Sequence, residues 1–321
     1  MNSGGEKISI IIVNLNTGNI LRECIESFFK YEKDFDSEII IVDQNSGDNS
    51  REVIIELAGR FDNIKYIFND TLKSFSYANN QGFDISTGDH VLIMNPDIVF
   101  INPVLKKLVS GMKNNPEIGA MSPYLMGKDG KFQQEYFRRY PSVMQFILFY
   151  MIFSKPFYRS SKLRCRYFEN SDINTNSGTV EFVEQIPCAF FLTKRKIFES
   201  VGKMDDKYIL FYEDVDLSFR IHRNYKLGVD MSVKVLHLGG QSFKTENNWW
   251  LHGRFLMSMH YFMEKNRGKF KSFLLKTFSL SNSVFIVAFE RIKLLMGKKD
   301  TYRYNKHKYY LQEFKKAYLQ F

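Results

Sequence analysis

The residues best suited to chemistry are polar side chains that follow apolar, strand-like runs of the sequence. Three such runs end in this way. The polar residues at the three ends are Asn14, Asn16 and Thr17, then Asp43, Asn45, Ser46 and Asp48, then Asn95 and Asp97. Asn and Asp are also common in turns, which could account for any one group. Because ligands of an open α/β sheet bind beyond the carboxyl ends of its strands, the three groups together predict one binding site.

The chemistry of this predicted site depends on the motifs that the sequence has and lacks. No GxGxxG follows the first strand-like run, and no GxxxxGK[ST] occurs. Hydride transfer and P-loop phosphoryl transfer are therefore disfavoured. A nucleotide site built from carboxylates and amides needs a divalent cation, since carboxylates would otherwise repel a pyrophosphate. The pattern predicts a nucleotide site that uses Mn²⁺ or Mg²⁺.

The elements that must position these residues alternate between strand and helix signals. The predicted strands are Ile8–Leu15, Glu38–Asp43, Ile64–Phe68, His90–Met94, Gly119–Ser122, Ala189–Thr193 and Val229–Val235. The predicted helices are Ile20–Lys30, Asp48–Arg60, Tyr77–Ile85, Pro103–Met112, Lys194–Val201 and Val215–Asn224. Repeated βαβ units predict an α/β fold with a doubly wound, mostly parallel sheet.

Two segments depart from this alternation. Residues 131–170 form a basic, aromatic insert with the apolar run Phe146–Phe153. That run is shorter than the ~20 residues of a membrane-spanning helix. It is consistent with core packing, and equally with a segment that dips into a membrane or covers an acceptor.

The C-terminal region carries the positive charge of the chain. The net charge is +10, and residues 244–321 contain sixteen Lys and Arg against five Asp and Glu. Phenylalanines at helical spacing among these lysines predict a basic amphipathic helical region. Such a region can meet an anionic membrane surface, pack on the core, or pair two subunits as a homodimer. We expect a nucleotide-binding domain over residues 1–243 and a helical region over 244–321.

Composition and cysteine content restrict the class of protein and its compartment. The chain is 44% hydrophobic and 25% charged, which is typical of globular rather than disordered or fibrous proteins. Cys24, Cys165 and Cys188 are widely spaced, which favours neither a disulfide framework nor a thiolate zinc site. The polar N-terminus does not resemble a signal peptide. We expect a cytoplasmic protein, peripheral at the inner face of the cell membrane.

Five segments in order resemble the family-2 glycosyltransferases, which have the GT-A fold, and especially their rhamnosyltransferase-like members from bacterial surface-polysaccharide pathways. The segments are ISIIIVNLNT (8–17), IIIVDQNSGDNS (39–50), SFSYANNQGFDISTGDHVLIMNPDI (74–98), CAFFLTKRKIFESVGKMDDKYILFYEDVDLSFR (188–220) and VLHLGGQS (235–242). The resemblance implies transfer of a hexose, such as L-rhamnose, from a dTDP- or UDP-sugar. It implies a glycan or polyprenyl-linked acceptor, as in O-antigen biosynthesis.

The resemblance also implies roles for the polar residues. Asp43 corresponds to the carboxylate that binds the nucleobase, and Asp97 to the last position of an Asp-x-Asp metal motif in which Asn95 replaces the first Asp. His237 resembles the family's later metal-ligating histidine, although a single histidine is more often structural. The further donor-binding residues that the resemblance implies are Asn14, Asn16, Thr17, Asn45, Phe75, Asn79 and Asn80. For Phe75, Asn79 and Asn80, helix capping and packing remain an alternative.

Inverting transfer needs a carboxylate that takes the proton of the attacking acceptor hydroxyl. Asp214, next to Glu213, matches the base in the family's Glu-Asp motif. An aspartate at this position could instead cap the helix predicted from Val215. Asp216 and Arg220 follow on that helix and are expected to brace the site.

The acceptor and the rival functions are less well defined by the sequence. The Gln-x-x-Arg-Trp motif of the family's processive synthases is absent, which favours addition of one or a few sugars. Trp249, Trp250 and Arg254 could line an acceptor site, or they could belong to the core. A nucleotidyltransferase is the nearest rival enzyme, although the Gly-rich phosphate loop expected of one is missing. A carbohydrate- or nucleic-acid-binding module is the non-enzymatic alternative, but the polar strand ends argue against it, and we expect no nucleic acid partner.

Overall fold

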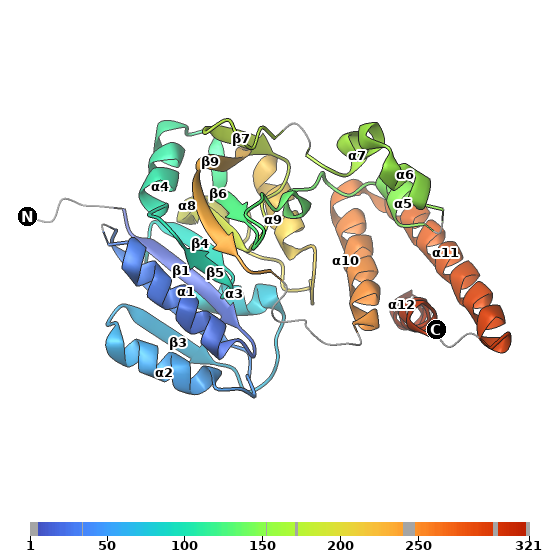
Figure 1. Cartoon of the computed structure of the whole chain (residues 1–321), viewed down its shortest axis with the longest axis horizontal. Coiled ribbons are helices and arrows are strands. Elements are labelled where there is room, and N and C mark those ends of the chain that lie inside the picture. The colour runs from blue at the N-terminus through green and yellow to red at the C-terminus, as the bar shows by residue number, and fades with distance from the viewer. Residues whose placement is uncertain are drawn as a thin grey trace, which may run out of the picture. The chain divides into compact units, whose positions relative to one another are not determined.

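The structure is a computed structural model that describes residues 6–33, 35–151, 153–170, 173–239, 248–297 and 301–318. It divides into two compact units (Figure 1). Residues 1–138, 170–207 and 213–242 form the first, called here the sheet unit. Residues 139–169, 208–212 and 243–321 form the second, called here the helical unit. Each unit is described separately.

The sheet unit contains one nine-stranded sheet. Its strands are β1 (Ile8–Asn14), β2 (Ser37–Asp43), β3 (Ile64–Phe68), β4 (His90–Met94), β5 (Ile98–Phe100), β6 (Ile118–Met126), β7 (Val180–Val183), β8 (Phe190–Lys194) and β9 (Lys226–His237). The order is β3-β2-β1-β4-β8-β6-β9-β5, with β7 paired to β9. The four strands from β3 to β4 are parallel, as predicted. Antiparallel pairings join β8 to β4 and to β6, and β5 and β7 to β9, so the remainder of the sheet is mixed.

The helices of the sheet unit connect these strands. They are α1 (Gly18–Tyr31), α2 (Ser50–Arg60), α3 (Phe75–Asp84), α4 (Leu105–Asn114), the 3₁₀ turn η1 (Gln134–Tyr136), α8 (Arg195–Ser200) and α9 (Glu213–His222). Each predicted helix is present, with ends shifted by up to two residues. The largest consequence is at α9, which begins at Glu213 and therefore holds Asp214 in its first turn.

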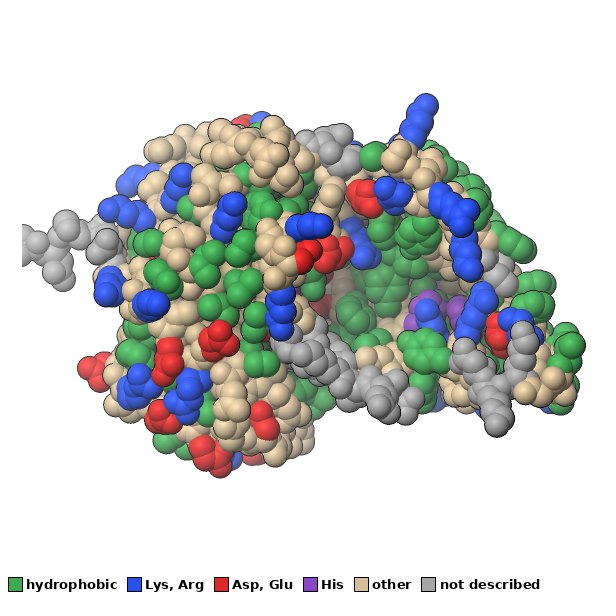
Figure 2. All heavy atoms as spheres, viewed as in Figure 1, with side chains coloured by type: hydrophobic (Ala, Val, Ile, Leu, Met, Phe, Trp, Pro, Cys, Tyr) green, Lys and Arg blue, Asp and Glu red, His purple; other side chains and the backbone are tan. Residues whose placement is uncertain are grey.

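The helical unit consists of α5 (Val143–Phe149), α6 (Lys155–Arg159), α7 (Ser161–Tyr167), α10 (Trp249–Arg267), α11 (Lys269–Leu295) and α12 (Tyr302–Tyr318). Phe146 and Phe149 of α5 are buried, as core packing of the apolar run requires, whereas Phe153 is exposed. Among the described residues, one helix, α11, is long enough and apolar enough to cross a membrane. Figure 2 shows hydrophobic side chains on the surface of this unit with Lys and Arg side chains among them.

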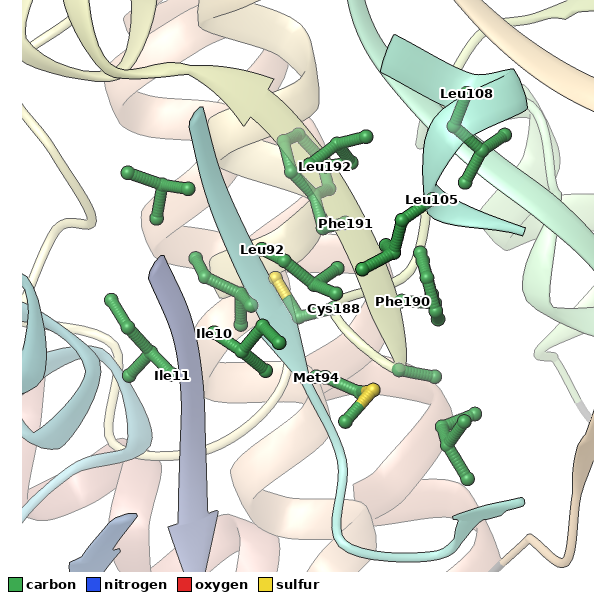
Figure 3. Close-up of a cluster of buried hydrophobic side chains, with 14 of the residues drawn as sticks. Ile10, Ile11, Leu92, Met94, Leu105, Leu108, Cys188, Phe190, Phe191 and Leu192 are labelled. Carbon is green, nitrogen blue, oxygen red and sulfur yellow. The ribbon is translucent and has the colours of Figure 1, made fainter. Parts of the chain in front are cut away.

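The core of the sheet unit explains why both faces of the sheet are covered. Successive side chains of a strand point to opposite faces. Ile39 and Ile41 of β2 belong to the main core, whereas Ile40 and Val42 pack with Ala78 of α3. Figure 3 shows the main core where side chains of β1, β4, β8 and α4 meet, among them Ile10, Leu92, Phe191 and Leu105.

One glycine sets the approach of α3 to the sheet. A Cβ at Gly82 would lie 2.6 Å from the Ile11 side chain, closer than side chains pack. Glycine at this position therefore lets α3 lie directly on β1 and β2. Helix α3 follows β3 and precedes β4, so this contact fixes the part of the chain that leads to Asp97.

Candidate active site

A network of short hydrogen bonds joins the ends of β1 and β2. Asn14 and Asp43 are register partners, and Asn14 Nδ2 donates to Asp43 Oδ1 over 2.8 Å. The Thr17 hydroxyl donates to Asn14 Oδ1 over 2.6 Å, and the Ser46 hydroxyl donates to Asp43 Oδ1 over 2.6 Å. Asn14, Thr17 and Asp43 are all buried. The structure thus brings together three of the predicted donor-binding residues and holds the Asp43 carboxylate in one orientation.

Two exposed asparagines shape the loops above this network. Asn16 has φ 53° and Asn45 has φ 59°, in the left-handed region that asparagine tolerates better than most residues. Asn16 Oδ1 accepts a hydrogen bond of 2.7 Å from the Gly47 backbone N–H. The two predicted donor-binding residues therefore define the backbone of the β1 and β2 loops, and Asn45 remains exposed beside Asp43.

Asp97 and His237 are brought together by the pairing of β5 with β9. Ile98 is the register partner of His237, and the backbone N–H of Leu238 donates to the carbonyl of Asp97 over 3.0 Å. His237 Nε2 lies 3.4 Å from Asp97 Oδ1, and both side chains are buried. The short strand β5 was not predicted, yet it is the element that assembles this pair.

Gln133 fixes the ring of His237. Gln133 Nε2 donates to the His237 backbone carbonyl over 3.1 Å, which leaves Gln133 Oε1 to accept from His237 Nδ1 over 2.6 Å. Nδ1 therefore carries a hydrogen directed at Gln133, and Nε2 is the ring nitrogen that faces Asp97, where it is placed to bind a metal. Partners of this kind orient histidines that bind metals. Sequence reasoning missed Gln133, because it lies 104 positions from His237 in a segment without regular spacing.

The donor set suits a divalent cation with additional ligands. Asp97 Oδ1 is buried and has no hydrogen-bond partner among the described residues, as expected of an atom held for a ligand. Together with His237 Nε2 it provides one oxygen and one nitrogen. Within the described ranges no group of three or more His, Cys, Asp or Glu could hold a metal. Asp97 and His237 would therefore be joined by oxygens from another source, such as a diphosphate. Asn95 is partly exposed and donates its backbone N–H to the Ala189 carbonyl.

The three predicted residues of α3 have contacts within the fold. Asn79 Nδ2 donates to the Phe75 carbonyl, and Phe75 packs against the main core. Asn80 makes two hydrogen bonds with the backbone of Met204, which ties α3 to the segment after α8. Only Asn79 keeps a buried atom without a partner in the described structure, its Oδ1. A role in donor binding remains a prediction for all three.

Glu213 and Asp214 form a crowded acidic pair in the first turn of α9. Asp214 Oδ1 accepts from the Val215 backbone N–H over 2.8 Å, and the backbone of Cys188 also donates to this carboxylate. Burial raises the pKa of both carboxyl groups, and the charge of Asp214 raises that of Glu213 further. Glu213 Oε2 is buried without a hydrogen-bond partner among the described atoms, whereas Arg138 favours the ionised form of Asp214. Glu213 therefore takes up a proton first, and Asp214 is the group left to act as a base.

An ion pair braces the helix that carries these carboxylates. Arg220 Nε donates to Asp216 over 2.8 Å, and Asp216 is fully buried. Arg220 also donates to the carbonyl of Val201, just after α8. Asp216 and Arg220 thus link α9 to the segment after α8, and the expectation that they brace the site stays a prediction.

Strand pairing places these groups at the same edge of the sheet. Asn14, Asp43 and Asn95 lie at the carboxyl ends of the parallel strands β1, β2 and β4. Phe190, the first residue of the antiparallel β8, pairs with Met94 at that same edge. Cys188, two residues earlier, contacts Asp214. The edge therefore combines a buried network of amides, hydroxyls and a carboxylate, a carboxylate and imidazole pair, and a carboxylate suited to accept a proton.

The five residues in front of Glu213 belong to the helical unit. Phe211 and Tyr212 have φ 67° and 70°, which bulky side chains rarely adopt. The Ser258 hydroxyl of α10 donates to the Leu210 carbonyl over 2.8 Å, and Phe255 packs against the rings of both Phe211 and Tyr212. Contacts with α10 thus hold the strained backbone that leads into α9.

The predicted acceptor residues have partners inside the helical unit. The ring of Trp249 packs edge-on against Tyr309 of α12 at 5.3 Å, and Arg254 forms an ion pair with Glu313 at 3.6 Å. Trp250 is partly exposed at the start of α10. These contacts fit packing between α10 and α12, and an acceptor role for the three residues remains a prediction.

Comparison with known proteins identifies the family. A family model described as glycosyl transferase family 2 matches residues 9–184, more than half of the chain. The chain belongs to glycosyl transferase family 2. Residues 9–184 include the ends of β1, β2 and β4, whereas Glu213, Asp214 and His237 lie beyond the match.

A relative and two solved structures illustrate how far the likeness to other family-2 and GT-A proteins extends. The GalNAc(5)-diNAcBac-PP-undecaprenol beta-1,3-glucosyltransferase of Campylobacter jejuni is 30% identical over 132 residues, 40% of this chain and 42% of that protein. A mannosyltransferase from Pyrobaculum calidifontis, in complex with GDP-Man and Mn²⁺, has a TM-score of 0.54 at 13% identity, covering 99% of this chain and 89% of that one. GalNAc-T7, solved with UDP, GalNAc and Mn²⁺, has a TM-score of 0.57 at 13% identity, and the match covers 76% of this chain and 45% of that one.

These comparisons confirm the predicted GT-A fold and the family. The chain spans about a third to a half of the length of the curated relatives that it matches. The rhamnosyltransferase-like subgroup remains a prediction. The last residues of the segment VLHLGGQS (235–242), from residue 240 onward, lie outside the described residues.

Proposed function

We propose that this family-2 protein is an inverting, metal-dependent glycosyltransferase that moves a hexose from a nucleotide sugar to a glycan or lipid-linked acceptor in cell-surface polysaccharide biosynthesis. The observation that carries the proposal is the sheet edge where the Asp43 network, the Asp97 and His237 pair, and the Glu213 and Asp214 pair occur together. A nucleotidyltransferase would need the first and second of these features but has no evident use for a buried base. Family membership also favours glycosyl transfer.

In the proposed reaction, the Asp43 network binds the nucleobase and fixes the donor at the ends of β1 and β2. Asp97 and His237 would hold Mn²⁺ or Mg²⁺, which supplies charge compensation for the departing nucleoside diphosphate when bound. Asp214 takes the proton of the acceptor hydroxyl as that hydroxyl attacks the anomeric carbon. Glu213, protonated beside it, keeps the local negative charge at one.

The proposed donor is a dTDP- or UDP-hexose, with dTDP-L-rhamnose as the first to be tested. The acceptor is proposed to be glycan or polyprenyl-linked, at the inner face of the cell membrane. The printed name of the Campylobacter jejuni relative includes an undecaprenol-linked glycan, which supports a lipid-linked acceptor. Trp249, Trp250 and Arg254 remain candidates to contact it.

The proposal can be tested with purified protein, Mn²⁺ and a panel of nucleotide sugars. One donor should release its nucleoside diphosphate, and Asp214→Asn should lower the turnover of that donor by at least ~10²-fold. Nucleotide affinity should stay within a factor of about two, because Asp214 does not belong to the base-binding network. The matched control is Asp62→Asn, an exposed carboxylate between α2 and β3, at the opposite end of the strands. Full activity of Asp214→Asn would remove this residue as the base.

The same protein tests the metal site separately. With only one carboxylate and one imidazole, Mn²⁺ should bind weakly alone and more tightly when a nucleoside diphosphate adds its oxygens. Calorimetric titration of Mn²⁺ with and without the nucleotide measures the difference. Equal affinities would show that the diphosphate does not complete the coordination.

A further inference from the structure

Helix α11 has its polar side packed inside the helical unit and its apolar side exposed. Seven of its residues are buried, and most are polar: Ser272, Leu275, Ser279, Asn282, Ser283, Ile286 and Glu290. The large apolar side chains on the opposite side are 43% to 81% exposed: Phe270, Phe273, Val284, Phe285, Phe289, Ile292 and Leu295. A surface helix of a water-soluble protein normally shows the reverse arrangement.

Hydrogen bonds to α10 and α12 fix this orientation. Ser279 Oγ lies 2.8 Å from both His260 Nε2 and the Tyr310 hydroxyl, and Ser283 Oγ lies 3.0 Å from His307 Nδ1. All five side chains are buried. Rotating α11 to bury its phenylalanines would leave these polar groups without partners, at a cost of about 1–3 kcal/mol each. The apolar side therefore stays outward.

The exposed charges of α11 lie near its two ends. Lys269 and Lys271 flank Phe270 at the start of the apolar stripe, and Arg291 lies near its end; all three are exposed. Lys276, between them, is only partly exposed and pairs with Glu264 of α10. The single acidic residue of α11, Glu290, is buried and paired with Lys293 and Arg303. The outer side of α11 is thus an apolar band rich in phenylalanine, with exposed cations near both ends and no exposed carboxylate.

We propose that this outer side of α11 inserts into the surface of an anionic lipid bilayer, with the helix axis in the plane of the membrane. The inference rests on the proposed function in one respect, which is that the proposed acceptor lies at a membrane. In such an orientation the apolar side chains reach the boundary between the headgroups and the acyl chains. The lysines and arginines bind the anionic headgroups. The occupant follows from charge: residues 244–321 carry sixteen Lys and Arg against five Asp and Glu. Two copies pairing through this side would bring like charges together.

An in-plane position also follows from the partners of α11. Its length of 27 residues corresponds to about 40 Å, enough to cross a hydrocarbon core of about 30 Å. However, α12 packs against α11 and exposes Lys308, Lys315 and Lys316. A spanning α11 would draw these charges into the hydrocarbon, whereas an in-plane α11 inserts only its outer side and leaves them in water.

The test is co-sedimentation of the full chain with phosphatidylcholine vesicles, with and without phosphatidylglycerol. Binding should need the anionic lipid and weaken in high salt. Phe273→Ser and Phe285→Ser should each lower vesicle affinity about tenfold without lowering the melting temperature, because both side chains are already exposed. The matched control is Phe182→Ser in β7, a phenylalanine 52% exposed in the sheet unit, which should bind as the unsubstituted chain does.

Three results would overturn the proposal. Vesicle binding that the α11 substitutions leave unchanged would show that another surface is responsible. A dimer in solution that Phe285→Ser converts to monomer, with no vesicle binding, would identify a second copy as the occupant. Protein that resists extraction at alkaline pH would indicate a spanning helix. Because nucleoside diphosphate release is measured without vesicles, failure of membrane binding and failure of the proposed transferase activity are distinguishable.

Discussion

At the scale of single residues, the hydrogen-bond partners of the candidate metal ligands are as informative as the ligands themselves. Asp97 and His237 could be named from the sequence because they follow a recognisable pattern. Gln133 could not, because nothing in its surroundings signals a partner for His237. Its two hydrogen bonds nevertheless fix the ring of His237 with Nε2 facing Asp97.

Replacing Gln133 should weaken the proposed metal site without removing a ligand. Gln133→Leu deletes both hydrogen bonds to His237, so the ring can rotate and change tautomer. We expect a loss of about 10- to 100-fold in Mn²⁺ affinity, measured by titration in the presence of a nucleoside diphosphate. Gln134→Leu, which removes one hydrogen bond to the Asn170 carbonyl, serves as the control. Equal losses in the two variants would mean that Gln133 acts only through the fold.

The acidic pair predicts a particular pH dependence. Burial raises the pKa of Asp214, so the acidic limb of kcat should lie above the ordinary aspartate pKa of about 4. Because Glu213 still holds its proton where Asp214 titrates, Glu213→Gln should leave that limb in place. Initial rates between acid and neutral pH measure it. A limb that moves downward in Glu213→Gln would show that Glu213 is ionised there and raises the pKa of Asp214 by repulsion.

At the scale of elements, the segment before α9 shows how contacts distant in sequence can hold the backbone in front of a candidate catalytic residue. Phe211 and Tyr212 have strained backbones, and the contacts that hold them come from α10. Nothing in the run ILFYED indicates left-handed residues, since glycine and asparagine are the usual signals and neither is present. This strained segment leads directly into Glu213 and Asp214.

Removal of one hydroxyl in α10 should therefore affect catalysis through the chain. Ser258→Ala deletes the hydrogen bond to the Leu210 carbonyl and lets the strained segment relax. We expect kcat to fall about tenfold with the donor KM unchanged, since small displacements of a catalytic group are costly. Thr277→Ala, which removes an exposed hydroxyl from α11, should have no effect. A change in donor KM instead of kcat would contradict a positioning role.

The elements that the sequence predicts well are those whose signals are local. Strands β1, β2, β3 and β4 were predicted within one or two residues, because each is a short, mostly apolar run bounded by polar residues. Strands β5 and β7 were missed, since they have three and four residues and exist through pairing with β9. The antiparallel partners of β8 likewise depend on contacts distant in sequence. The metal pair forms at β5, so its assembly could not be derived from local pattern.

At the scale of the whole molecule, buried histidines make the helical unit sensitive to acid. Burial lowers the pKa of His260 and His307 to about 3 each. Their pKa in the unfolded chain is about 6.5, so both states are neutral above that pH. Below it, the unfolded chain binds protons that the folded unit does not, and stability falls as pH falls.

Tryptophan fluorescence can follow this loss selectively. The chain has two tryptophans, Trp249 and Trp250, and both begin α10. Their thermal transition should move to lower temperature as the pH falls below about 6.5. His260→Gln should reduce that shift, whereas His222→Gln in α9 should preserve it. A transition independent of pH would mean that the histidines are hydrated in the folded unit.

The route of the chain through its two units has a consequence for synthesis on the ribosome. Residues 208–212 emerge about forty positions before α10, whose side chains later hold them. Until α10 is complete, the backbone before Glu213 has no partner for its strained conformation. The nascent protein should thus complete its sheet before α10 emerges, and become competent for catalysis only after α10 has been synthesised and has packed on this segment.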